Sequence, residues 1–590
     1  MARGNRMITI GWLRLLRASV FFLCVLAVSS AQAFSVHYRD LSELNKTEWQ
    51  NGDAVPSPGS EQALNGGRFI IALPSFPDNL RRIGPQTSGR FTATLHNLQL
   101  PLVAHIPATH KHPTRWLPML ASQWALSTDK KLLLFRLRED AAWSDGVAVD
   151  SEDFAFSGLF ITSDTTAAEW QKRQLERLTD GINIYSDKVF AFRIRGKADE
   201  ALKVLSGFRP FARHVYENRR NWPEAFNWYP EPTTGPYYLA QVRAGESLMF
   251  RRLSDWWGDQ LPYFKHRFNA DQVVFRTMQI HESELQLFTL GELSAIEYRD
   301  ADYWQSGVVR TAISGKRISL VRLLTSASSQ QPPSGLLINP RMQTINNSHE
   351  RAWLLNQLNI QYIIENDYTP PLQQQSGLLA DHAAYAQAQQ APVTPKLTPA
   401  NITLSYTDDR DRAFLDKLKQ SAADHHINLQ LKKLSPAALS DKLALAEYEL
   451  VWLRLNAPLS NEGLVSLFNK TRGQVFIGGI PKAGIEADPD NPADSARRIE
   501  QYLLEENLYT PGPAMHYTQA AYWQWLHLPA QGAPYYAEKL FDPFSPLYGG
   551  LFWINKKQRA DILAKPQNGH KKIRVEVINP DQPHSQDSEQ

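Results

Sequence analysis

The chain has 590 residues, which is too long for one hydrophobic core, so the length predicts two or three lobes. Its 63 lysines and arginines nearly balance its 60 acidic residues, and the net charge is +3. This balance lacks the excess of positive charge typical of proteins that bind phosphate backbones, and therefore argues against nucleic acid as a partner.

Residues 1–33 have the pattern of a secretory signal peptide, with a basic start and no acidic residue. The apolar run Ala18–Val28 has 11 residues, too few for a bilayer, which needs roughly 20. Ala31-Gln32-Ala33 is a small-x-small cleavage site. We therefore expect cleavage after Ala33, which removes four arginines and leaves a charge of −1. An uncleaved membrane anchor is the alternative.

The single cysteine, Cys24, lies inside this predicted signal. The mature protein would then have no disulfide, no thiolate catalyst and no cysteine metal site. Phe21-Phe22-Leu23 before Cys24 does not resemble a lipid-attachment sequence, so we expect a free protein and not a lipoprotein. Export without disulfides favours a bacterial periplasm.

The polar stretch 34–65, with Pro56, Pro58 and Gly59, predicts a loose leader. The first strand of the fold is expected at Gly66–Pro74.

A hairpin, a turn and a helix are predicted between residues 120 and 160. Apolar runs at Trp124–Leu126 and Leu132–Leu137 flank a polar break and predict two paired strands. Trp143–Gly146 predicts a turn with glycine at positive φ. A helix should begin after Asp150, capped by Asp150 with Asp153 at the third position. Its apolar residues, expected to face inward or pack on the hairpin, are Phe154, Phe156, Leu159 and Phe160.

The following segments repeat this mixture of strands and helices. Alternation over Asn183–Ile194 predicts a second hairpin, and 199–227 is expected to be helical. A strand is predicted at Gln272–Arg276 and a helix at Ser283–Leu290.

Residues 400–455 predict a doubly wound α/β lobe. Strands are expected at Ile402–Tyr406, Ile427–Leu431 and Tyr448–Leu453, with a helix after each of the first two. Asp409 or Asp411 can cap the first of these helices. Ligands of such lobes bind beyond the carboxyl ends of the strands, so the third strand would direct Arg454 and Asn456 toward a cleft.

The stretch 120–156 resembles a signature of the extracellular solute-binding proteins of family 5, the periplasmic oligopeptide, dipeptide and nickel receptors of ABC importers. The positions in step with the family pattern are Leu120, Ala121, Trp124, Ser127, Asp129, Phe135, Leu137, Arg138, Trp143, Ser144, Asp145, Gly146, Asp153 and Phe156. Thr234-Gly235-Pro236-Tyr237 is similar to a second family motif. Arg267–Asp271 resembles the subgroup of long-oligopeptide and microcin receptors.

The resemblance implies an α/β, two-lobed periplasmic-binding-protein fold, class II-like, with an extra β-rich subdomain and a hinge between the lobes. The expected division is lobe I at 66–105, 232–320 and 509–572, the extra subdomain at 106–231, lobe II at 321–508 and a tail at 573–590.

It also implies a periplasmic receptor that holds an oligopeptide or peptide-like solute between its lobes and delivers it to an inner-membrane ABC permease. Such a receptor is a monomer without a cofactor and is not an enzyme. The residues expected to bind ligand are Trp452, Arg454 and Asn456. Family peptide receptors carry an aspartate shortly after this tryptophan to pair with the peptide amine, but here Arg454 stands close to its place. Because a cation at this place would repel an ammonium group, the hypothesis is that the ligand is anionic or has a blocked amine. The alternatives are that Arg454 is a solvated residue at a strand end and that Trp452 has a packing role.

Two other function classes remain open at this point. The same lobes could report a ligand to a membrane partner as a sensing receptor. An exported hydrolase is the second alternative, although the sequence has no Gly-x-Ser-x-Gly elbow, phosphate loop or His-Glu-x-x-His motif. Adjacent His425 and His426 would point apart on a helix or strand, so no metal site is predicted.

Overall fold

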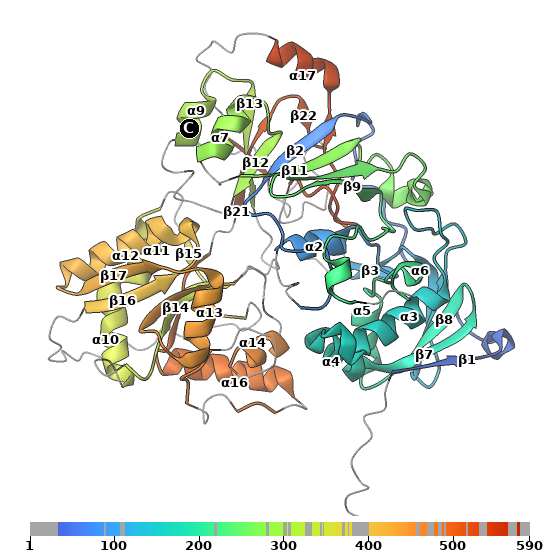
Figure 1. The fold of residues 1–590 in the computed structure, drawn as a ribbon, viewed down its shortest axis with the longest axis horizontal. Coiled ribbons are helices and arrows are strands. Elements are labelled where there is room, and N and C mark those ends of the chain that lie inside the picture. The colour runs from blue at the N-terminus through green and yellow to red at the C-terminus, as the bar shows by residue number, and fades with distance from the viewer. Residues whose placement is uncertain are drawn as a thin grey trace, which may run out of the picture. The chain divides into compact units, whose positions relative to one another are not determined.

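A computed structural model provides the fold (Figure 1). The residues that it describes are 34–85, 87, 90–106, 113–217, 221–278, 282–298, 304, 308–324, 333–342, 345, 347–368, 372–375, 377–379, 401–455, 459, 461–468, 477–481, 486–488, 491–514, 517–529, 540–564 and 575–578. The predicted signal peptide therefore lies outside the described residues. Within them, no helix is both long and apolar enough to cross a membrane.

The chain forms two compact units. The first contains the described residues of Met1–Gly52, Pro101–Glu139 and Asp150–Glu217. The second contains those of Asp53–Leu100, Asp140–Val149 and Asn218–Gln590. The lobe boundaries given above stay a prediction, but the first unit includes most of the segment assigned to the extra subdomain.

The first unit is built on a five-stranded sheet with the strand order β1-β7-β8-β6-β5. Its strands are β1 (Ser35–Tyr38), β5 (Ala121–Leu126), β6 (Leu132–Leu137), β7 (Thr179–Ser186) and β8 (Val189–Ile194), and β3 (Val103–Ile106) pairs with β4 (Arg115–Pro118). The pairs β5–β6 and β7–β8 are antiparallel, which confirms both predicted hairpins. Gly146, in the predicted turn, has a φ of 88°.

Helix α3 (Ser151–Thr162) begins as predicted. The Asp150 side chain accepts from the Asp153 amide at 3.1 Å and the Asp153 side chain accepts from the Asp150 amide at 3.2 Å, a capping box. Phe154 is fully buried, but Leu159 is 46% exposed, so the expectation that it faces inward is wrong. The helix is apolar on more than one face, and periodicity alone could not identify the buried one.

The segment 199–227 is less helical than predicted. Its described residues hold nearly all of α5 (Ala198–Leu205), one short helix, α6 (Arg213–Tyr216), and the turn η3 (Glu224–Phe226). The remaining helical elements of the first unit are α4 (Glu169–Leu178), η1 (Leu41–Leu44) and η2 (Asp164–Thr166).

The start of the predicted loose leader is an ordered strand. β1 pairs in parallel with β7, with Ser35 opposite Gly181. Arg193 on β8 fixes this pairing, because its Nη2 donates to the backbone oxygens of Ser35 and Asp180, each at 3.0 Å. Phe34, just before β1, is 5% exposed and lies against Gly158 of α3. A polar four-residue strand has no clear pattern, and its partner is more than 140 residues away.

We expect Gly158→Ala to lower the free energy of unfolding by about 1–3 kcal/mol, because the added Cβ would lie 2.0 Å from Cζ of Phe34. Urea denaturation of the mature chain, followed by circular dichroism, measures the loss. In a Phe34→Ala background the same change should instead stabilise, by up to about 1 kcal/mol, since alanine is the better helix former. An equal loss in both backgrounds would show that the ring contact is not the cause.

The second unit contains three larger sheets, and two of them have four strands each. One has the order β2-β11-β10-β9 and the other the order β12-β21-β13-β24. The strands are β2 (Arg68–Leu73), β9 (Tyr237–Arg243), β10 (Ser247–Arg252), β11 (Gln272–Thr277), β12 (Ala295–Tyr298), β13 (Ile318–Leu324), β21 (Tyr517–Trp523) and β24 (Val575–Ile578). The accompanying elements are α2 (Arg90–Asn97), η4 (Trp257–Gln260), η5 (Pro262–Phe264), α7 (Glu282–Thr289), α9 (Val308–Ile313), α17 (Lys556–Leu563) and the pair β22 (Leu526–His527) and β23 (Trp553–Ile554).

Arg267, from the subgroup-like run, is a buried structural cation. Its Nη2 donates to the Gly549 carbonyl at 2.8 Å and to the Ser545 carbonyl at 3.2 Å. Desolvation by burial lowers the pKa of the Arg267 guanidinium to about 10. Arg267 therefore joins the loop before β11 to the segment 545–549.

The third sheet has the order β17-β16-β18-β14-β19 (Figure 1). Its strands are β14 (Ser334–Ile338), β16 (Asn401–Tyr406), β17 (Asn428–Lys433), β18 (Leu450–Arg454) and β19 (Tyr509–Pro511), and a separate pair is β15 (Gln373–Gln374) with β20 (Pro513–Ala514). Its helices are α10 (Ser348–Leu358), α11 (Ile360–Asn366), α12 (Arg412–Asp424), α13 (Pro436–Leu445), α14 (Asn461–Phe468) and α16 (Pro492–Glu505), with η6 (Asp409–Asp411) before α12. β16 runs parallel to both β17 and β18, which confirms the predicted βαβ units.

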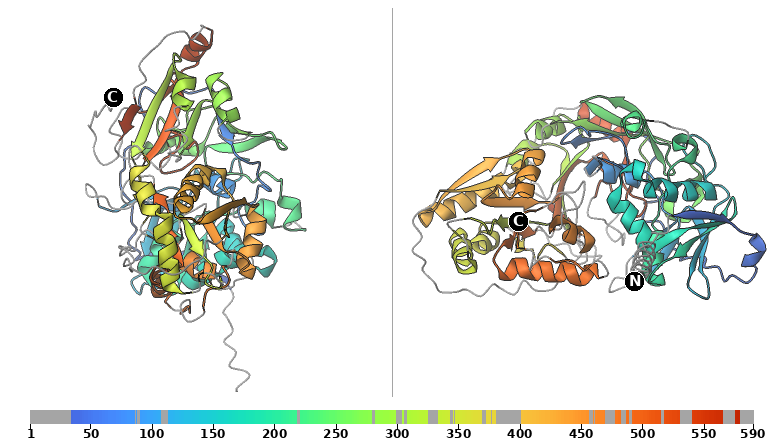
Figure 2. Two further views of the ribbon diagram at one scale, coloured as in Figure 1. Left: turned by 90° about the vertical axis from the view of Figure 1, so that its left-hand side faces the viewer. Right: turned by 60° about the horizontal axis from the view of Figure 1, so that its bottom comes forward.

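Each face of this sheet has its own core, because alternate residues of a strand point to opposite sides. Leu450 and Trp452 of β18 pack with side chains of α10, α11 and α12. Val451 and Leu453 pack with side chains of α13, α14 and α16. Helices therefore cover both faces of the sheet (Figures 1 and 2).

Candidate functional site

The candidate site lies at the carboxyl ends of β16, β17 and β18, which is where doubly wound sheets bind ligands. These three parallel strands end at Tyr406, Lys433 and Arg454. The antiparallel strand β14 begins at the same edge, with Ser334 opposite Arg454. We call this set of strand ends the carboxyl edge.

Arg454 is paired with an aspartate from the next loop. Its Nε donates to Oδ1 and Oδ2 of Asp411 at 2.9 and 2.8 Å, and its Nη2 also contacts Oδ1. The side chain of Asp411 is 3% exposed and that of Arg454 is 28% exposed. The predicted cation is therefore at the edge, but with a buried carboxylate directly behind it.

Two further ion pairs involve the end of β17, η6 and the first turns of α12. Lys433 pairs with Asp409, and this hydrogen bond raises the pKa of the Lys433 ammonium. Arg412 pairs with Asp416 at 2.8 Å, and hydrogen bonds to Asp416 and then to Tyr406 raise the pKa of its guanidinium. Both pairs are exposed, and each joins one cation to one carboxylate.

Trp452 lies beneath the edge. Its side chain is 1% exposed, and its ring centroid is 5.0 Å from that of Phe414 on α12. A Cβ added at Gly512 would lie 3.0 Å from the same indole. Within the described part of the chain, neither Trp452 Nε1 nor Thr510 Oγ1 has a hydrogen-bond partner, although both atoms are buried. Leu336 separates Trp452 from Thr510 in the sheet, so the two side chains share one face.

Of the three predicted site residues, Arg454 lies at this edge, and Trp452, two residues before it on β18, is buried beneath the edge. Asn456 lies outside the described residues. Sequence reasoning missed the pairing role of Asp411, which it treated as a helix cap. The side chain makes no cap hydrogen bond, and its carboxylate binds Arg454. Asp411 and Arg454 are 43 residues apart in the sequence, and no local pattern connects them.

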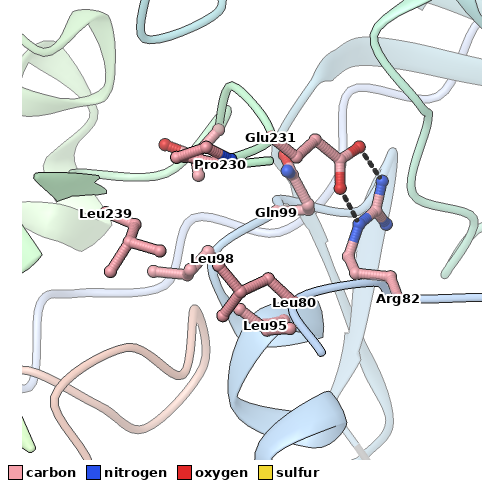
Figure 3. A pocket seen from close by; sticks show the side chains of 9 residues that line it. Leu80, Arg82, Leu95, Leu98, Gln99, Pro230, Glu231 and Leu239 are labelled. Atoms are coloured by element: carbon pink, nitrogen blue, oxygen red, sulfur yellow. Dashed lines mark hydrogen bonds and ion pairs between the residues drawn. The ribbon is translucent and has the colours of Figure 1, made fainter. Parts of the chain in front are cut away.

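A pocket lies elsewhere in the second unit (Figure 3). It has about 310 Å³ of empty space, open solvent included, and is lined by Leu80, Arg82, Leu95, Leu98, Gln99, Pro230, Glu231, Thr233 and Leu239. Arg82 and Glu231 form a two-pronged ion pair in its wall, with distances of 2.7 and 2.6 Å. Their side chains are 2% and 6% exposed, so the pair is almost fully desolvated. Its charges satisfy each other, and the rest of the wall is mostly apolar.

The described residues offer no cluster of metal ligands. Among the described residues, no group of three or more His, Cys, Asp or Glu side chains could hold a metal ion.

Part of the chain is similar to a known protein family, and most of it is similar to solved structures. Residues 115–351 match the family described as bacterial extracellular solute-binding proteins, family 5 Middle. The ABC transporter substrate-binding protein CtaP of Listeria monocytogenes has a TM-score of 0.61 at 16% identity, covering 83% of this chain and 99% of that one. Residues 115–351 therefore resemble the family 5 solute-binding proteins, and the fold of the chain resembles that of CtaP.

One further solved structure and one further sequence are also similar to this chain. The oligopeptide-binding protein AppA of Bacillus subtilis, solved with a nonapeptide, has a TM-score of 0.58 at 13% identity, covering 84% of this chain and all of AppA. A putative binding protein of Brucella melitensis is 25% identical over 171 residues, which are 29% of this chain. That match spans only 27% of the Brucella protein.

The α/β, two-lobed fold expected from the sequence is confirmed, because the chain superimposes on family 5 structures over most of its length. Family 5 consists of extracellular and periplasmic solute-binding proteins and is not an enzyme family.

Proposed function

We propose that this chain is the periplasmic substrate-binding component of an ABC transporter, which holds an oligopeptide or peptide-like solute and delivers it to an inner-membrane permease. The observation that carries the proposal is the two-lobed family 5 fold over more than four-fifths of the chain. The matched structures include an ABC transporter substrate-binding protein and an oligopeptide-binding protein with a bound nonapeptide.

The solute would lie between the lobes and contact lobe II at the carboxyl edge, near Trp452, Arg454 and Asn456. Peptide backbones pair with strand edges, and each net hydrogen bond contributes roughly 1 kcal/mol. Micromolar affinity corresponds to about −8 kcal/mol, so a few such bonds and some burial are enough. A solute that contacts both lobes favours the closed state over the open state, which is how binding would be signalled to the permease.

We also propose where the protein acts and how it treats its solute. The protein would reach the periplasm through a signal peptide cleaved after Ala33 and act as a monomer. It would bind its solute without altering it, use no cofactor and bind no nucleic acid.

Native mass spectrometry of the protein purified from its own periplasm tests the proposal. We expect a monomer that begins at Phe34 and carries extra mass which dissociates as intact peptide. Calorimetry with synthetic copies of the released species should then give micromolar or tighter affinity. If the protein cleaved added peptides, and the fragments accumulated with time, the result would instead support a hydrolase. Failure to find any peptide that is bound to the protein or binds to it would contradict the proposal.

A further inference from the structure

Asp411 is a buried carboxylate with one side-chain partner. Arg454 donates all the hydrogen bonds that the Asp411 carboxylate accepts from the described residues. The carboxylate is 3% exposed, so water cannot replace Arg454 without rearrangement. A buried carboxylate needs a counter-ion, because desolvation of an unpaired charge is costly.

The partner of this carboxylate is the more exposed member of the pair. The Arg454 side chain is 28% exposed and lies at the end of β18, at the carboxyl edge. Asp411 lies behind it, immediately before α12. A solute at this edge therefore meets the guanidinium first, and a cation can reach Asp411 only by displacing Arg454.

We infer that Asp411 is a cation-binding socket for an ammonium or guanidinium group, and that the chain fills this socket with its own Arg454. The native edge therefore selects a solute segment that has no free amine. A cationic end would have to displace a two-pronged, charge-assisted contact, and an anionic end would have to draw Arg454 away from Asp411. An uncharged or amine-blocked segment needs neither change. The part of this inference that concerns solutes rests on the proposed function.

Removing Arg454 should open the socket to small cations. Millimolar methylguanidinium should raise the melting temperature of Arg454→Ala above the value measured in the same concentration of sodium chloride. The reason is that a ligand that binds only the folded state stabilises that state. The wild-type protein and the double variant Asp411→Asn/Arg454→Ala should show no such rise. Arg454→Lys is a control whose own ammonium fills the socket, so it too should not respond. If Arg454→Ala does not fold, Arg454→Gln replaces it. Its neutral amide can hydrogen-bond to Asp411 but leaves the carboxylate without a counter-ion, so methylguanidinium should still raise the melting temperature.

The same variants should change the selectivity for peptides. Calorimetry with one peptide in free and N-acetylated forms should show a preference of less than about threefold in the wild type. Arg454→Ala should prefer the free amine by about tenfold or more, which corresponds to about 1.4 kcal/mol. The double variant should again show no preference. A tenfold preference of the wild type for the free amine would overturn the inference.

The two measurements separate this inference from the proposed function. Rescue by methylguanidinium without any peptide binding would support the socket and contradict the proposed function. Peptide binding with neither rescue nor a change in preference would support the proposed function and overturn the socket.

Discussion

Glu231→Gln should lower the free energy of unfolding by about 3–5 kcal/mol, because it leaves the Arg82 guanidinium buried without its carboxylate. The pair is joined by two hydrogen bonds of 2.6 and 2.7 Å, and both side chains are at most 6% exposed. Little water reaches the guanidinium to compensate for the lost charge. Urea denaturation followed by circular dichroism gives the difference.

The pair Arg276 and Glu292 is a matched control in the same unit. Its contact is as short, 2.5 Å, but its side chains are 44% and 47% exposed. Glu292→Gln should therefore cost less than about 1 kcal/mol, since exposed pairs contribute little. The double change of Arg82→Met and Glu231→Leu should recover much of the loss, because it removes both buried charges. Equal losses at Glu231 and Glu292 would show that burial of the pair has no effect on stability.

Trp452→Ala should also cost about 3–5 kcal/mol, because it leaves a large cavity at the centre of a buried core. The ring is 1% exposed and packs against Phe414 and Gly512. The change should also weaken solute binding under the proposed function, since the ring supports the strand end that carries Arg454. Circular dichroism is the appropriate probe, because the substitution itself alters tryptophan fluorescence.

Two variants test whether packing explains the loss. Trp452→Phe keeps most of the apolar contact and removes the buried, unpartnered Nε1, so it should cost less than the alanine change. Trp228→Ala removes a tryptophan that is 45% exposed, with its ring stacked 5.6 Å from that of Phe76, and should cost clearly less than Trp452→Ala. If the buried and exposed tryptophans gave the same loss, the packing account of Trp452 would be wrong.

Local elements were predictable where short-range signals agree. The β5–β6 hairpin follows from apolar runs around a polar break, and α3 begins at its predicted capping box. The βαβ units of the third sheet follow from alternating and helical periodicities in turn. The predictions that were wrong concern contacts between distant parts of the chain. Strand β1 depends on a partner far along the chain, and the exposure of Leu159 depends on which face of an apolar helix the sheet covers.

The candidate site shows the same division. The α/β pattern and the end of β18 identified Arg454 as a residue of the carboxyl edge, and its charge suggested an anionic or blocked ligand. The buried carboxylate of Asp411 changes that interpretation, because a guanidinium already bound to a carboxylate is not a free anion site. The pairing joins two loops that follow different strands, and no spacing in the sequence encodes it.

The sequence by itself determined the family resemblance and the order of strands and helices over much of the chain. It also predicted an edge at which a ligand should bind. These follow from interactions between residues close in the chain, such as caps, turns and alternation. Only the tertiary structure decided which charges are buried and which groups neutralise them, at Asp411 with Arg454 and at Arg82 with Glu231. Burial and pairing are set by contacts between distant segments, and they determine what charge a site can offer to a solute.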